Sequence, residues 1–157
     1  MIKNLRFMTR IELSTFINAP VAVCFDMARS IDLHVSSMAQ TREKAISGRT
    51  GGLIGLGETV TWRAKHFGIW QTLTSKVTEF NYPNSFTDEM VYGVFKSFRH
   101  ENIFFGVNSQ TVMKDIFIFE SPLGILGELV NFVFLGKYME KLLIKRNEVI
   151  KEAAELE

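Results

Sequence analysis

The feature that most constrains the fold is a change in hydrophobic period near residue 121. Before this point apolar and polar residues alternate in short runs, and in residues 57–66 the alternation places Val60, Trp62 and His66 on one face. After it, apolar residues recur every three or four positions as far as residue 153. Alternation predicts half-buried strands, and the longer spacing predicts an amphipathic helix. We therefore expect a sheet packed against one long C-terminal helix.

The remaining segments complete an α+β pattern. A strand at 10–19 runs into Pro20, which suits the first turn of a helix, and two short helices are expected at 21–30 and 31–39. The strands predicted after them are 41–52, 57–66, 69–80, 86–93, 98–106 and 111–120. The expected fold is a curved antiparallel sheet of six or seven strands wrapped around the C-terminal helix. The pattern leaves open whether that helix is continuous through Gly136.

Composition limits the classes of partner. The 157 residues, 46% of them hydrophobic, suit a single domain spanning residues 1–157 with a sizeable core. The formal net charge of +1 gives no electrostatic case for a nucleic-acid partner. The most apolar stretch, 123–139, contains Glu128 and Lys137 and is shorter than the roughly 20 residues that span a bilayer, so no integral membrane segment is expected.

Cysteine usage and the N-terminal segment bear on location. Cys24 is the single cysteine, so no disulfide framework is expected, and a lone thiol fits a reducing compartment. The first 14 residues are basic but lack an apolar stretch of signal-peptide length. We therefore expect a cytoplasmic protein.

Large apolar side chains are abundant, with 14 Phe, 7 Met and 2 Trp. Aromatic side chains bury large areas, and methionine adapts to irregular shapes. Such residues fill an ordinary core, and they also suit the wall of a cavity for an apolar ligand. Composition leaves both interpretations open.

Polar residues among the inward-facing positions are the candidates for a site. Asp115 shares a strand face with Met113 and Phe117, and His100 shares one with Phe104. A buried carboxylate needs a partner, so we expect Asp115 and His100 to interact. The pair could brace the sheet, anchor a ligand, or act as acid and base, in which case these two residues are the catalytic candidates. The residues expected to line a ligand site are Trp62, His66, Leu73, Asp88, Met90, His100, Phe104, Met113, Asp115 and Phe117.

Other kinds of site have little support in the sequence. His34, His66 and His100 lack metal-ligand spacing, and the chain has no Cys-x-x-Cys pair, so no metal and no cofactor is expected. The glycine-rich run at 48–57 lacks the Lys-Ser/Thr pair of a phosphate loop and is expected to be a turn. Cys24, on the apolar face of a short helix, is expected to be a buried, inert thiol.

The order of elements resembles that of the START-like (SRPBCC) superfamily. This superfamily includes polyketide cyclase/dehydrase-type and birch-pollen-allergen-like proteins, and its fold is called the helix grip. The likeness begins with the strand–proline–helix entry at 14–33, and the later part is similar to a bacterial subgroup without a settled activity. The positions that carry that similarity are Phe98, His100, Phe104, Thr111, Met113, Asp115, Pro122, Leu123, Gly124, Leu126, Gly127 and Arg146.

Three functional hypotheses follow. The resemblance and the Phe/Met-rich interior favour a protein that binds or carries a small hydrophobic molecule, such as a lipid, an isoprenoid or an aromatic metabolite. The alternative is an enzyme of cyclase, dehydratase or hydrolase type that uses His100 and Asp115 as an acid–base pair. The third is a protein-interaction module. The sequence does not predict the oligomeric state.

Overall fold

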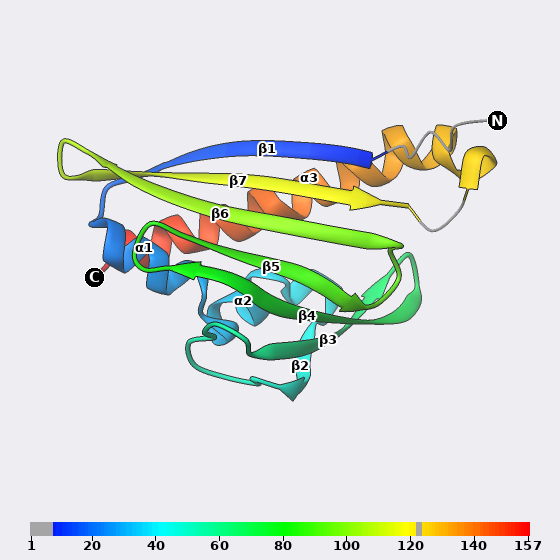
Figure 1. Ribbon diagram of the computed structural model, residues 1–157, viewed down its shortest axis with the longest axis horizontal. Coiled ribbons are helices and arrows are strands. Elements are labelled where there is room, and N and C mark those ends of the chain that lie inside the picture. The colour runs from blue at the N-terminus through cyan, green and yellow to red at the C-terminus, as the bar shows by residue number, and fades with distance from the viewer. Residues whose placement is uncertain (1–7, 122–123) are drawn as a thin grey trace.

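The computed structural model describes residues 8–121 and 124–157, with the backbone alone for 124–133. Seven strands within these residues form one antiparallel sheet in the order β1-β7-β6-β5-β4-β3-β2 (Figure 1). The strands are β1 (Met8–Ile17), β2 (Lys44–Gly48), β3 (Thr59–His66), β4 (Ile69–Asn81), β5 (Ser85–Tyr92), β6 (Ser97–Val107) and β7 (Gln110–Glu120). The first strand pairs with the last, and two helices lie between β1 and β2 in the chain. The predicted fold class is confirmed.

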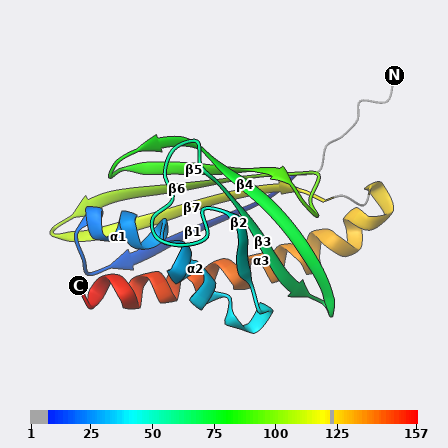
Figure 2. The same cartoon turned by 90° about the horizontal axis from the view of Figure 1, so that it is seen from below.

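The long helix α3 (Gly124–Glu155) runs along the concave side of the sheet, which curves around it (Figure 2). It is continuous through Gly136, which settles the point that the sequence left open. A Cβ atom at Gly136 would lie 3.5 Å from the Thr9 side chain, so the helix passes close to β1 here. None of the described helices has the length and hydrophobicity of a membrane-spanning segment.

Two short helices close one part of the space between sheet and α3. They are α1 (Val21–Ala28), which follows Pro20, and α2 (Ile31–Ser37), whose N-cap Ser30 accepts a hydrogen bond from the Leu33 amide. The α1 residue Phe25 is fully buried among four aromatic rings, with centroid distances of 5.1–5.4 Å. Those rings belong to Phe80, Tyr82, Phe86 and Phe104. This aromatic cluster fixes α1 to the sheet.

The segment before β3 differs from its prediction as one strand at 41–52. A 3-10 turn (Ala39–Thr41) comes first, and the strand covers only Lys44–Gly48. Gly48 has a φ of +73°, and a Cβ atom there would lie 2.2 Å from the Thr59 carbonyl oxygen, so only glycine fits. The glycine-rich run is a turn, as predicted.

Strand parity predicted the two faces of the sheet correctly. On β6, His100, Asn102 and Phe104 are buried on the concave side, whereas Arg99 and Glu101 lie on the convex side. Arg99 forms ion pairs there with Glu79, Glu89 and Glu101. The polar residues that matter for a site are therefore the ones on the concave face.

Candidate functional site

A cavity of about 390 Å³ lies between the concave face of the sheet, α2 and α3. Its size falls within the range of about 300–1,000 Å³ typical of small-molecule sites. The wall is mainly apolar, and strands and helix contribute to it alike. Representative apolar lining residues are Val60, Trp62, Leu73, Phe98, Phe117 and Leu143. We call this space the central cavity.

The central cavity reaches the surface at the β3–β4 hairpin. Phe67 lines the cavity yet is 55% exposed, and its ring lies 4.6 Å from that of Tyr138 on α3. The neighbouring His66 Nδ1 and the Tyr138 hydroxyl are 2.6 Å apart. Burial lowers the pKa of His66 and raises that of Tyr138, so both groups stay uncharged near neutral pH. The hydrogen bond between these two side chains ties α3 to the sheet at the rim.

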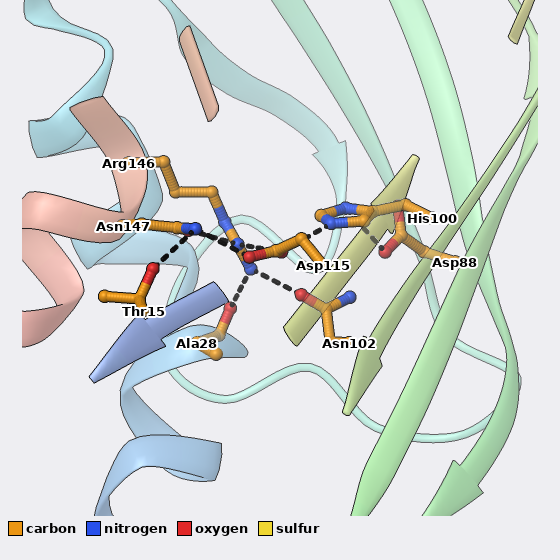
Figure 3. A network of polar contacts seen from close by, with 8 residues as sticks. All are labelled: Thr15, Ala28, Asp88, His100, Asn102, Asp115, Arg146 and Asn147. Atoms are coloured by element: carbon orange, nitrogen blue, oxygen red, sulfur yellow. Dashed lines mark hydrogen bonds and ion pairs between the residues drawn. The ribbon is translucent and has the colours of Figure 1, made fainter. Parts of the chain in front are cut away.

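A buried polar network lies at the inner wall of the cavity (Figure 3). Its centre is Asp115, which is fully buried on β7. The Asp115 Oδ1 atom accepts from His100 Nε2 at 2.8 Å and from Arg146 Nη1 at 3.0 Å, while Oδ2 accepts from Asn147 Nδ2 at 2.6 Å. The network consists of Asp88, His100, Asn102, Asp115, Arg146 and Asn147.

Arg146 crosses from α3 to the sheet and uses both terminal nitrogens. Nη1 donates to Asp115 and to Asn147 Oδ1 at 3.1 Å. Nη2 donates to Asn102 Oδ1 at 2.8 Å and to the Ala28 carbonyl oxygen at 3.3 Å. Each terminal nitrogen carries two protons, so all four are engaged within the protein. Arg146 thus joins the helix, the sheet and α1, although it also lines the cavity.

The charge state of Asp115 follows from these contacts. Burial acts to raise its pKa, but the hydrogen bond from His100 and the charge of Arg146 outweigh burial, so the pKa lies below its ordinary value. Asp115 is therefore ionised and can only accept hydrogen bonds. It follows that His100 donates through Nε2, which leaves Nδ1 as the ring atom available to other groups.

Asp88 on β5 faces the other nitrogen of His100. Its Oδ1 atom lies 3.7 Å from His100 Nδ1, which is too long for a hydrogen bond. Asp88 lines the cavity, and burial raises the pKa of its carboxyl group. His100 thus lies between two different carboxyl groups. Asp115 is ionised and accepts several hydrogen bonds, whereas Asp88 has no close partner in the network.

A second polar pair lies on another part of the cavity wall. His34 Nε2 of α2 is 2.5 Å from Glu43 Oε1, and the His34 ring lies 4.3 Å from the Trp62 ring. All three residues line the cavity. The two side chains are thus hydrogen-bonded to each other at the cavity wall.

The structure brings together part of the predicted site. Of the candidates, Trp62, His66, Leu73, Asp88, His100 and Phe117 line the central cavity. The other four, Met90, Phe104, Met113 and Asp115, are not among its lining residues. Phe104 and Met113 pack in the cluster around Phe25, and Met90 packs beside Phe98. Asp115 lies behind His100 and acts on the cavity through that residue.

Three residues of the network were not predicted as site residues. Asn102 shares a strand face with His100, and Arg146 interrupts the apolar stripe of the last helix. A charged residue within such a stripe is the signal that could have pointed to Arg146. Asn147 gave no comparable signal, because it lies beside the stripe.

The arrangement limits the chemistry available. Within the part of the chain that the structure describes, no group of three or more His, Cys, Asp or Glu side chains could hold a metal ion. Cys24 is fully buried, and burial raises the pKa of its thiol, which makes it a poor nucleophile. At the inner wall, Asp88 and His100 can act on a molecule in the cavity through hydrogen bonding or proton transfer.

Comparisons with known proteins support the fold. The aromatase/cyclase Zhui from Streptomyces sp. R1128 is 13% identical, with a TM-score of 0.75 and coverage of 95% of this chain and 94% of that one. A protein from Thermus thermophilus, TTHA0849, is 15% identical, with a TM-score of 0.72 and coverage of 92% and 99%. Major latex-like protein 151 from Panax ginseng is 14% identical, with a TM-score of 0.66 and coverage of 94% and 97%. No family model matches the sequence, and no curated protein matches it.

These likenesses cover nearly the whole chain. At such identities they show the fold and not the activity. The chain has the helix-grip fold, as the order of its elements predicted.

Proposed function

We propose that the chain is a single ligand-binding domain, residues 1–157, that binds or carries a small hydrophobic molecule in the central cavity. One observation supports this most strongly. About 390 Å³ of space lies inside the fold, and most of its wall consists of aliphatic and aromatic side chains. Burying apolar ligand surface against such a wall contributes about 25 cal/mol per Å². A lipid, an isoprenoid or an aromatic metabolite has the required character.

The second candidate function is catalysis by the His100–Asp88 side of the network. Ionised Asp115 orients the imidazole, and its Nδ1 atom faces the cavity side, where Asp88 stands 3.7 Å away. A histidine held in this way can transfer a proton to or from a bound molecule. Asp115 itself is committed to Arg146 and Asn147, so the acid–base partner of His100 would be Asp88 rather than Asp115.

Native mass spectrometry of freshly purified protein tests the binding function. We expect a mass above that of the bare chain, which disappears after denaturation as a small apolar molecule is released. Ala64→Phe should abolish this mass difference, because Ala64 is buried in the cavity wall and a phenyl ring there would occupy the space. Ala39→Phe, at an exposed position in the 3-10 turn, is the matched control and should retain the ligand.

The result for Ala64→Phe shows whether a bound molecule occupies the central cavity. Equal ligand retention in wild type and Ala64→Phe would place any bound molecule outside the central cavity and contradict the proposal. Release of a chemically altered molecule after incubation, lost in His100→Ala, would favour the catalytic candidate instead.

A further inference from the structure

The charge balance of the inner wall restricts the polar end of a ligand. The network holds two carboxyl groups, Asp88 and Asp115, against one permanent cation, Arg146. All four terminal protons of Arg146 already bond to protein atoms. The guanidinium group therefore has no terminal donor left for the carboxylate of a ligand, which would need such a donor to lose its hydration.

The other charged groups of the wall are engaged as well. Arg29 forms an ion pair with Asp26 at 2.8 Å and donates to the Ile54 carbonyl oxygen. The Glu43 carboxyl group is in contact with the His34 ring. An anionic ligand end would thus meet further carboxylates and no unpaired cation among the described lining residues.

At the inner wall, Asp88 offers the cavity an acceptor of hydrogen bonds. With Nε2–H directed to Asp115, Nδ1 is the ring nitrogen of His100 that lies on the side of Asp88. Asp88 stands next to it, 3.7 Å away, without a hydrogen bond from another side chain of the network. A hydroxyl or amino group placed beside these two residues would donate a hydrogen bond to Asp88. Such a group supplies the hydrogen-bond donor that Asp88 lacks within the network.

We propose, as a refinement that rests on the proposed function, that the cavity selects apolar molecules whose polar end is a hydroxyl or amino group. This group donates a hydrogen bond to Asp88, next to His100, while the apolar body fills the space lined by residues such as Trp62 and Leu73. Molecules that end in a carboxylate are rejected. Asp88 is the residue that determines this selectivity.

Three linear probes of ten carbon atoms each test the inference: decan-1-ol, decylamine and decanoate. Each displaces an apolar fluorescent dye from the ligand-free protein at pH 7.5, below its micellar concentration. We expect decan-1-ol and decylamine to bind at least about tenfold more tightly than decanoate, which corresponds to about 1.4 kcal/mol. In Asp88→Asn the preference for decylamine over decanoate should fall by about tenfold or more, because the asparagine carries no charge.

The control is Glu89→Gln, one position along β5 on the convex face, where Glu89 pairs with Arg99. It removes the same charge from the same strand and should leave the order of the three probes unchanged. Decanoate binding as tightly as decan-1-ol would overturn the inference while leaving the binding function intact. Failure of all three probes and of the dye to bind would overturn both. An unchanged order in Asp88→Asn would show that Asp88 does not set the selectivity.

Discussion

At the scale of single residues, His100 lies between two carboxyl groups of opposite character. Asp115 is fully buried and surrounded by donors, which hold its pKa below the ordinary value. Asp88 has 23% of its side chain exposed, and burial raises its pKa because no comparable donor offsets it. The same residue type therefore stabilises the fold at one position and is available for a ligand at the other.

Replacing Asp115 by Asn should destabilise the protein strongly. The asparagine keeps the shape but leaves the Arg146 charge buried without a counter-ion, and it turns an amide N–H group toward other donors. Breaking a buried ion pair in this way costs about 3–5 kcal/mol. Chemical denaturation measures the change. Glu101→Gln, in the surface ion-pair cluster on β6, is the control and should cost about 1 kcal/mol or less.

The effect of Asp115→Asn should depend on pH. Because the pKa of Asp115 is lowered in the folded state, its contribution is fully present above its unfolded value of about 4 and is lost as the pH falls toward the folded value. The difference in stability between wild type and variant should therefore narrow between about pH 5 and pH 3. A constant difference over this range would contradict the assignment of Asp115 as ionised.

Asp88→Asn should have the opposite effect and raise stability at pH 7, by about 1 kcal/mol. The raised pKa means that the folded state disfavours ionised Asp88, so this carboxyl group reduces stability once the pH exceeds its unfolded value of about 4. The gain should disappear near pH 3, where both states bind the proton. Thermal melts of variant and wild type at the two pH values measure it. A variant that is less stable at pH 7 would show that Asp88 is a structural partner of His100.

At the scale of elements, Phe25 is the α1 side chain with the most aromatic contacts to the sheet. Phe25→Ala should destabilise the protein by about 3–5 kcal/mol, because it removes a fully buried ring that contacts four others. Phe16→Ala is the matched control. Phe16 is 66% exposed on β1, so its loss should change stability by about 0.5 kcal/mol or less. Denaturant titration compares the two, and equal losses would mean that α1 is not anchored through Phe25.

The same helix explains which site residues the sequence could predict. Alternation identified the inward faces of the strands, and with them the contact between His100 and Asp115. It does not show how far along each strand the cavity extends. Phe104 and Met113 share the inward face but pack beneath α1, because Phe25 fills that end of the sheet. The position of the short helices is set by tertiary packing and not by strand parity.

The polar network shows a second limit of sequence reasoning. Helical spacing identifies the buried side of α3, on which Leu143 and Ile150 lie, but it does not give the position of that helix along the sheet. The partners of Arg146 and Asn147 come from strands and helices about 30 to 130 residues away in the chain. Only the assembled fold brings these groups within hydrogen-bonding distance.

At the scale of the whole molecule, the sheet curves around α3, but side chains do not fill all of the space between them. Protein interiors are normally close-packed, and an unfilled apolar cavity costs stability. Here the aromatic cluster around Phe25 closes one part of the interior, while the part lined by Trp62 and Leu73 is left open. A fold that keeps such a space is expected to gain stability when a ligand fills it.

Trp62 provides the most direct measurement of this account. It is 9% exposed and lines the central cavity, whereas Trp70, the other tryptophan, is 45% exposed and stacks with Arg63. Trp70→Phe leaves Trp62 as the single indole reporter. Titrating this variant, freed of endogenous ligand, with decan-1-ol should change the Trp62 emission in a saturable way, and Ala64→Phe in the same background should abolish the response. An unchanged emission with no saturable binding would contradict the claim that the central cavity holds a hydrophobic ligand.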